Sequence, residues 1–357
     1  MSDLTKRYPY LLPLLVLVFV FLVLNAPLLS FAYLFKWDAW DLFWPMFQCL
    51  AQSLQNGRLP LWDPRPCGGV PFHADPLTGT FYPVGLVIGL IWGGGHTVYQ
   101  IYWLTHWLFA VLGLFFLAKQ FGLSPWAACM ASVSFAFSGF FVGQAQHTVS
   151  IVSVGYIVWC WVVLHKAWNE HLLYAVPAGC LFGVGALGGY PGMTVYGALA
   201  TVLWVILRYR AFPKNLATLG IAFLCAFVVM SPSYLSFLLE CQGYTDRVGF
   251  LSVREACNVN RFPLDAVVSL VTPGITVAYY GLFHVEPGEA PMLNGYFGIL
   301  GLTGLAVSLA VPRFRREWGW LLVFMGIVFL FSLGSVGGGK GAGVLSPPSA
   351  RICSTHE

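Results

Sequence analysis

Long apolar runs recur along most of this chain and constrain its fold more than any other feature. A helix needs about 20 apolar residues to cross a bilayer. Nine runs come near that length: Tyr10–Leu34, Val98–Ala118, Trp126–Val142, Thr148–Leu164, Leu172–Leu187, Pro191–Leu207, Leu216–Leu239, Leu293–Val311 and Trp318–Leu333. Only 9% of the 357 residues are charged, against roughly 25% in a typical soluble domain. The chain is therefore predicted to be an all-α integral membrane protein with about nine transmembrane helices. A soluble enzyme, a disordered chain and a nucleic-acid-binding protein are excluded.

Basic residues are distributed unevenly among the connections between these runs. Short segments hold Lys6, Arg7, Lys119, Lys166, Arg208, Arg210, Lys214, Arg313, Arg315 and Arg316. Two long loops, 36–97 and 240–292, hold Lys36, Arg58, Arg65, Arg247, Arg254 and Arg261. The positive-inside rule then places the N-terminus in the cytoplasm and both long loops outside the cytoplasmic membrane. The shorter run Phe81–Trp92 would reverse this distribution if it crossed the bilayer, so it is predicted to be a re-entrant or interfacial helix.

None of the nine runs contains an Asp, Glu, Lys or Arg residue. Proton- and ion-coupled transporters usually carry ionisable groups inside the membrane, so any chemistry is expected in the outer loops. Residues 1–334 are interpreted as one membrane domain. The glycine-rich segment 335–357 is predicted to be a disordered tail.

The first outer loop has two parts. Residues Trp40–Gln55 place apolar side chains at helical spacing and are followed by Asn56-Gly57, which is typical of a helix C-terminus. This segment is predicted to be an interfacial helix on the membrane surface. An irregular loop follows, in which five prolines recur at Pro60, Pro64, Pro66, Pro71 and Pro76. Ordered loops of this kind often carry functional residues.

Several motifs resemble those of a known family. They are D-x6-P at Asp38 and Pro45, then NGRLPLWDP, GGVPFHADPLTGTFYP and FAFSGF, with weaker matches at RFPLDAVVSLVTPG and NGYFGILGL. Together they resemble the YfhO-type bacterial membrane proteins of the GT-C glycosyltransferase superfamily, over about residues 10 to 334. The resemblance implies a GT-C-like bundle. It also implies inverting transfer of a sugar from a polyprenyl-phosphate donor to an extracytoplasmic glycan, polymer or lipid acceptor.

The resemblance points to Asp38 as the general base, with Asp41 as the second candidate. The donor's leaving group is a lipid phosphate that is already anionic, so the acceptor hydroxyl needs only a positioned carboxylate to take its proton. The alternative is structural: Asp38 would cap the surface helix and Asp41 would be a solvated acid in its first turn.

Other polar residues of the outer face are candidates for substrate binding. Arg58 and Arg65 suit a phosphate, although attraction to anionic headgroups would also explain them. His73 and Asp75 form an H-x-D pair that would either ligate Mg²⁺ or Mn²⁺ or brace the loop. His147, at the outer end of the third predicted span, is expected near the donor phosphate or the acceptor. Asp63, directly before a proline, is interpreted as the start of a turn.

Two other functions remain open at this point. The first is a transporter or flippase for lipid-linked saccharides, which would not depend on Asp38. The second is an inactive, truncated family member, because the tail 335–357 does not resemble the sequence with which the family continues.

Overall fold

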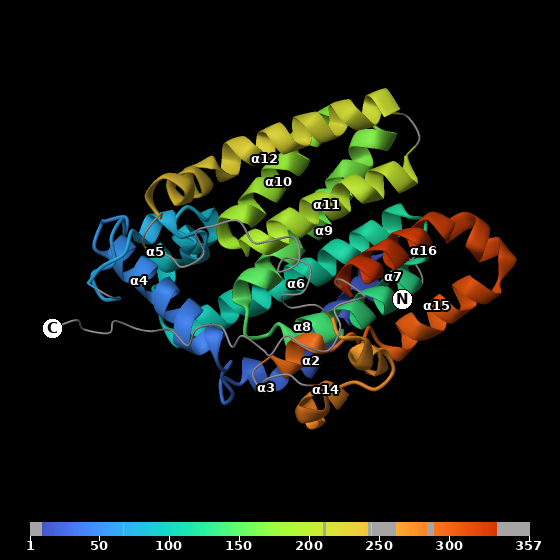
Figure 1. The fold of residues 1–357 in the computed structure, drawn as a ribbon, viewed down its shortest axis with the longest axis horizontal. Coiled ribbons are helices and arrows are strands. Elements are labelled where there is room, and N and C mark those ends of the chain that lie inside the picture. Colours follow the sequence, from blue (N-terminus) through green and yellow to red (C-terminus); the bar gives the residue numbers. More distant parts are fainter. Residues whose placement is uncertain are drawn as a thin grey trace, which may run out of the picture.

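A computed structural model of the chain describes residues 9–66, 68–209, 212–241, 244, 262–283 and 289–333. Throughout these ranges the regular structure is helical, and the only β-type pairing is an isolated antiparallel bridge between Asp63 and Val70 (Figure 1). The prediction of an all-α protein is confirmed. Lys6, Arg7, Arg210, Arg247, Arg254, Arg261 and the tail 335–357 lie outside the described residues.

Five helical segments are long and apolar enough to cross a membrane. They are α6 (His96–Gln120), α7 and α8 taken together (Pro125–Ala136 and Gly139–Gly143), α9 (Thr148–Asn169), α11 (Pro191–Arg208) and α12 (Phe212–Glu240). Each covers one of the predicted spans. Their length and composition support the interpretation as a helical membrane protein.

The other four predicted spans form shorter or more polar helices. The first run breaks at Asn25 into α2 (Leu11–Leu24) and α3 (Ala26–Leu29), where the Asn25 side chain donates to Phe21 O and Pro27 follows. Two more, α10 (Ala175–Gly188) and α15 (Ile299–Ala310), have 14 and 12 residues. The 21 residues of α16 (Pro312–Ser332) begin with a strongly charged turn. Nine spans therefore remain a prediction.

The helix α5 (Pro83–Trp92) lies where the short apolar run was expected. It has 10 residues, about half of what a bilayer crossing needs. It packs against α4 (Trp44–Gln55), which covers most of the helix predicted at Trp40–Gln55 and ends at Asn56 as its sequence indicates. The position of α4 on the membrane surface remains a prediction. A short, non-spanning helix at the position of α5 agrees with the sequence prediction.

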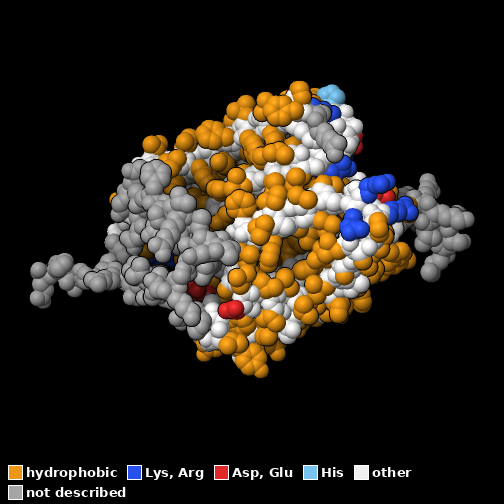
Figure 2. Space-filling model, turned by 45° about the vertical axis from the view of Figure 1, so that its right-hand side comes forward, with side chains coloured by type: hydrophobic (Ala, Val, Ile, Leu, Met, Phe, Trp, Pro, Cys, Tyr) orange, Lys and Arg blue, Asp and Glu red, His pale blue; other side chains and the backbone are white. Residues whose placement is uncertain are grey.

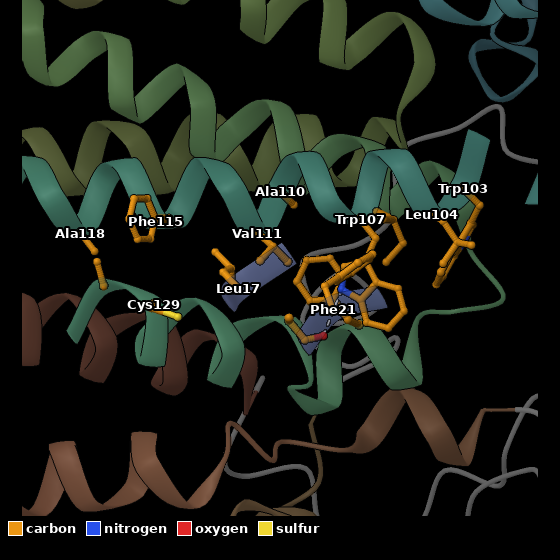
Figure 3. Packing of buried hydrophobic residues seen from close by; sticks show 14 of the residues in the cluster. Leu17, Phe21, Trp103, Leu104, Trp107, Ala110, Val111, Phe115, Ala118 and Cys129 are labelled. Carbon is orange, nitrogen blue, oxygen red and sulfur yellow. Dashed lines mark hydrogen bonds between the residues drawn. The ribbon is translucent and has the colours of Figure 1, made fainter. Parts of the chain in front are cut away.

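Aromatic side chains on α6 form the centre of the bundle (Figure 3). Trp103, Trp107 and Phe115 recur at helical spacing on the face of α6 that meets α2 and α7, and all three are buried. The Trp107 ring meets Phe21 of α2 edge-on at 5.3 Å, and its indole N–H donates to Ala136 O of α7 at 3.0 Å. Such aromatic pairs contribute about 0.5–1.5 kcal/mol beyond the area they bury, so these contacts hold α2 and α7 against α6.

The described basic residues of the helix ends gather at one end of the bundle, which we call the basic end (Figure 2). Contacts link its helices: Lys214 of α12 donates to Trp168 O of α9, and the Arg208 guanidinium of α11 lies over the Trp320 ring of α16. Its members lie near the ends of α6, α9 and α11 and the starts of α12 and α16: Lys119, Lys166, Arg208, Lys214, Arg313, Arg315 and Arg316. The opposite end, which carries the first outer loop, is called the loop end. The positive-inside interpretation predicts such a separation, and the side of the membrane that each end faces remains a prediction.

One tyrosine of the first outer loop anchors that loop in the bundle. Tyr82 is 1% exposed, and its hydroxyl lies 2.5 Å from His106 Nε2 and 2.9 Å from the Tyr156 hydroxyl. His106 Nδ1 lies 2.7 Å from Tyr102 O. Because a carbonyl only accepts, Nδ1 carries the proton and Nε2 accepts from Tyr82. The Tyr82 ring packs so tightly on Gly188 that a Cβ there would lie 2.5 Å from it.

We expect Tyr82→Phe to weaken the fold. The change leaves His106 Nε2 buried without its donor, which costs about 1–3 kcal/mol of unfolding free energy. Thermal unfolding of the detergent-solubilised protein, followed by tryptophan fluorescence, measures the effect. Tyr279→Phe, at a tyrosine that is 63% exposed, is the matched control. Equal unfolding temperatures for the two variants would show that the Tyr82 hydroxyl does not hold the loop.

Candidate functional site

The chain enters the loop end through an unusual backbone conformation. Trp37 has φ = +53°, in the left-handed region that a bulky side chain rarely adopts. Asp38 follows directly and opens a short π-helix, η1 (Ala39–Phe43), which continues into α4. Backbone strain of this kind costs about 1–3 kcal/mol and tends to occur at functional sites.

The carboxylate of Asp38 faces the ring of His147. Asp38 Oδ2 lies 3.2 Å from His147 Nε2, with the Asp38 side chain 50% exposed and that of His147 19% exposed. Although Asp38 precedes the first helical turn, its side chain makes no capping hydrogen bond. The capping alternative for Asp38 is therefore wrong, because its carboxylate is turned toward α9 instead of the backbone of its own helix.

His147 is held from its other side as well. It directly precedes α9, and its Nδ1 lies 2.8 Å from Gln144 Oε1. Its ring also meets Phe43 of η1 edge-on at 6.4 Å. The contacts from Asp38, Gln144 and Phe43 define the orientation of the ring, so the pair is preorganised.

The electrostatics of the pair favour a neutral ring. Burial lowers the pKa of His147 from its ordinary value, and the nearby Asp38 carboxylate opposes this shift only in part. A histidine with a lowered pKa stays neutral over more of the physiological pH range. Both ring nitrogens of His147 face oxygen atoms, Asp38 Oδ2 and Gln144 Oε1. A neutral ring with its proton on Nε2 donates to the charged Asp38 carboxylate when the Gln144 amide turns its NH2 group toward Nδ1.

A second histidine–carboxylate pair joins the loop to α12. His73, in the 3-10 turn η2 (Phe72–Ala74), has its Nε2 3.0 Å from Oε2 of Glu240, the last residue of α12. Its Nδ1 lies 2.9 Å from Leu61 O. Both ring nitrogens thus face oxygen acceptors, and a ring that carries both protons donates to each. This pair ties the irregular loop to the end of α12.

The two members of the H-x-D pair point to different partners. Asp75 accepts a hydrogen bond of 2.9 Å from Leu77 N and caps the 3-10 turn η3 (Pro76–Thr78), whereas His73 contacts Glu240. Within the described ranges, no group of three or more His, Cys, Asp or Glu side chains is placed to hold a metal ion. These contacts are those of a loop brace.

Arg65 is bound to Asp63 in a bidentate pair. Arg65 Nε and one terminal amino group lie 2.8 Å from the two carboxylate oxygens of Asp63. Asp63 also accepts from Arg65 N, which makes the turn that the sequence predicts. The hydrogen bond from Arg65 holds the pKa of the Asp63 carboxyl below its ordinary value. The Arg65 side chain is still 57% exposed, so it remains reachable from solvent.

The remaining predicted residues lie on the surface of the same loop. Arg58, which follows α4, and Asp41 in η1 are exposed. No described hydrogen bond or ion pair joins either side chain to Asp38 or His147. Of the predicted site residues, the structure therefore brings Asp38 and His147 into contact. It pairs His73 with Glu240 of α12.

Two features of the site had little sequence signal. Nothing in the sequence indicates the positive φ of Trp37, because an aromatic residue rarely adopts that conformation. Gln144 lies three residues before His147, a spacing that allows contact across one helical turn, but the chain offers Gln146 as an equal candidate.

We expect the free energy of unfolding to decrease in mild acid because of the lowered pKa of His147. Its pKa is lowered in the folded state from about 6.5 in the unfolded chain, so the unfolded state binds the proton first as the pH falls. The contribution of the His147 pKa shift to the free energy of unfolding is fully present above about pH 6.5. It is lost as the pH falls through that value toward the pKa of His147 in the folded state. His147→Gln should remove this dependence.

Thermal unfolding in detergent, between about pH 7.5 and about pH 5, measures the difference. The unfolding temperature of the wild type should fall more steeply than that of His147→Gln. His171→Gln, at an exposed histidine of the other end, is the control and should follow the wild type. Parallel curves for the wild type and His147→Gln would rule out the effect.

Comparison with known proteins adds no relative: no family model, no curated protein and no solved structure matches this chain.

Proposed function

We propose that the protein is a membrane glycosyltransferase of the GT-C type. It transfers a sugar from a polyprenyl-phosphate donor to an extracytoplasmic glycan, polymer or lipid acceptor, with the loop end outside the cytoplasmic membrane. The observation that carries the proposal is the contact of 3.2 Å between Asp38 Oδ2 and His147 Nε2 at that end. It supports a role for Asp38 as a positioned, accessible base, as the resemblance of the loop motifs implies.

In this reaction Asp38 is the general base. The acceptor hydroxyl oxygen attacks the anomeric carbon, its proton passes to the Asp38 carboxylate, and the bond to the donor phosphate breaks. The phosphate leaves with the electron pair, and the anomeric configuration inverts. His147 is the positioning residue: its Nε2–H orients the carboxylate and keeps it charged until the proton arrives.

The leaving phosphate needs positive charge near it. Arg65 suits this role because Asp63 uses two of its five N–H donors and fixes its plane, which leaves three donors and an exposed side chain. Arg58 is an exposed second candidate, and a divalent ion such as Mg²⁺ or Mn²⁺ would be a further source of charge.

The lipid part of the donor would approach through the bilayer. α5 turns a strongly apolar surface outward beside α4: Leu90, Ile91 and Trp92 are 55%, 59% and 63% exposed. An exposed apolar face on a helix too short to span suits a position in the membrane interface. A polyprenyl chain lying there would bring its phosphate to the loop end.

A transfer assay in membrane vesicles tests the proposal. Wild type and Asp38→Asn are incubated with a panel of radiolabelled polyprenyl-phosphate sugars. Asparagine keeps the size of the side chain but cannot take a proton, so we expect transfer to fall by about 10²- to 10⁴-fold. Asp265→Asn, at an exposed acid of the second loop, should transfer at the wild-type rate.

The other outcomes are informative. Transfer by Asp38→Asn at the wild-type rate would exclude Asp38 as the base and direct the same test to Asp41. If the folded wild-type protein transferred sugar from none of the donors, the proposed glycosyltransferase function would be wrong. Movement of a fluorescent lipid-linked saccharide across the vesicle membrane would then identify a flippase.

A further inference from the structure

A groove of about 460 Å³ lies at the basic end, where α6 and α9 end beside the start of α2. This volume is within the range of about 300–1,000 Å³ that small-molecule sites occupy. Its wall includes Tyr10, Phe116, Lys119, Trp159, Val162 and Lys166. Phe116 and Lys119 share one face of α6, and the other three helical residues share one face of α9, because they recur three or four positions apart.

Aromatic side chains line much of the groove. The rings of Phe116 and Trp159 lie 5.6 Å apart, and Phe116 is 39% exposed. The Trp159 indole N–H is already bonded to Phe109 O at 2.8 Å, so it offers no free donor to a ligand. Such a surface favours hydrocarbon over a water-soluble ion.

The two lysines of the rim keep donors available. The Lys119 ammonium donates to Leu123 O and lies 5.1 Å from the centre of the Tyr10 ring, which leaves two of its three N–H groups. The Lys166 ammonium lies 5.6 Å from the centre of the Tyr174 ring and makes no hydrogen bond or ion pair among the described residues. Among the described residues no acid lines the groove, and Glu170, which directly follows α9, is exposed.

We propose that this groove binds an anionic phospholipid. The headgroup phosphate contacts the ammonium groups of Lys119 and Lys166, and the start of an acyl chain lies on Phe116 and Trp159. Both lysines are near the ends of candidate spans, the depth at which headgroups lie. Basic pockets between transmembrane helices bind anionic headgroups on the cytoplasmic side, which is the side predicted for this end. The groove and the Asp38–His147 pair lie at opposite ends of the bundle, so this inference does not depend on the proposed transfer reaction.

Native mass spectrometry of the full-length protein in detergent tests the proposal. Equal amounts of phosphatidylglycerol and phosphatidylcholine with the same acyl chains are added, and bound lipid is counted. We expect the wild type to prefer phosphatidylglycerol about tenfold, from roughly equal contributions of the two lysines. The variant Lys119→Gln/Lys166→Gln should lose this preference, and Lys119→Arg/Lys166→Arg should keep it.

A matched control removes the same charge elsewhere at the basic end. Arg315→Gln/Arg316→Gln, at two exposed arginines of α16, should bind lipid as the wild type does. If the double lysine variant does not fold, Lys166→Gln carries the test, because that ammonium makes no hydrogen bond in the described part, and it should lower the preference about threefold. An unchanged preference in the lysine variants, or equal binding of the two lipids by the wild type, would overturn the proposal.

Discussion

The position of the first outer loop depends on a short chain of hydrogen bonds inside the helix bundle. The Tyr82 hydroxyl reaches His106 on α6 and Tyr156 on α9, and Gly188 on α10 leaves room for its ring. A buried hydroxyl without partners would be strongly destabilising, so the loop has one favourable register on the bundle. That register places the start of the loop beside α9, where Asp38 meets His147, and its middle beside α12, where His73 meets Glu240.

The two ends of the bundle carry different kinds of charged side chain. At the loop end, carboxylates contact histidines or an arginine, and each of these contacts also holds part of the loop in place. At the basic end, lysines lie over tyrosine rings beside an open groove. This arrangement fits the proposed transfer from a lipid-phosphate donor at the loop end and the proposed binding of an anionic phospholipid at the basic end. Both halves of that interpretation rest on charge complementarity with a ligand.

Much of the fold could be predicted from local sequence properties. The helices α6, α9, α11 and α12 follow apolar runs of sufficient length, and α4 ends at the Asn56-Gly57 signal. The break at Asn25 was missed because the run Tyr10–Leu34 was interpreted by its length and overall hydrophobicity, although Asn25 and Pro27 interrupt it. The break depends on an internal hydrogen bond to Phe21 O, which no hydropathy pattern records. For Asp38, the sequence left base and cap as alternatives, since both use the same residue type at the same place.

The sequence by itself determined that this is a helical membrane protein with its chemistry-bearing residues outside the apolar runs. Hydrophobic length and charge placement are local properties, and they act before any tertiary contact forms. Only the tertiary structure decided which groups meet. Asp38 and His147, or His73 and Glu240, are far apart in the chain, and the packing of α6, α9 and α12 brings them within hydrogen-bonding distance. The groove with Lys119 and Lys166 has the same origin, because it exists only where the ends of two helices come together.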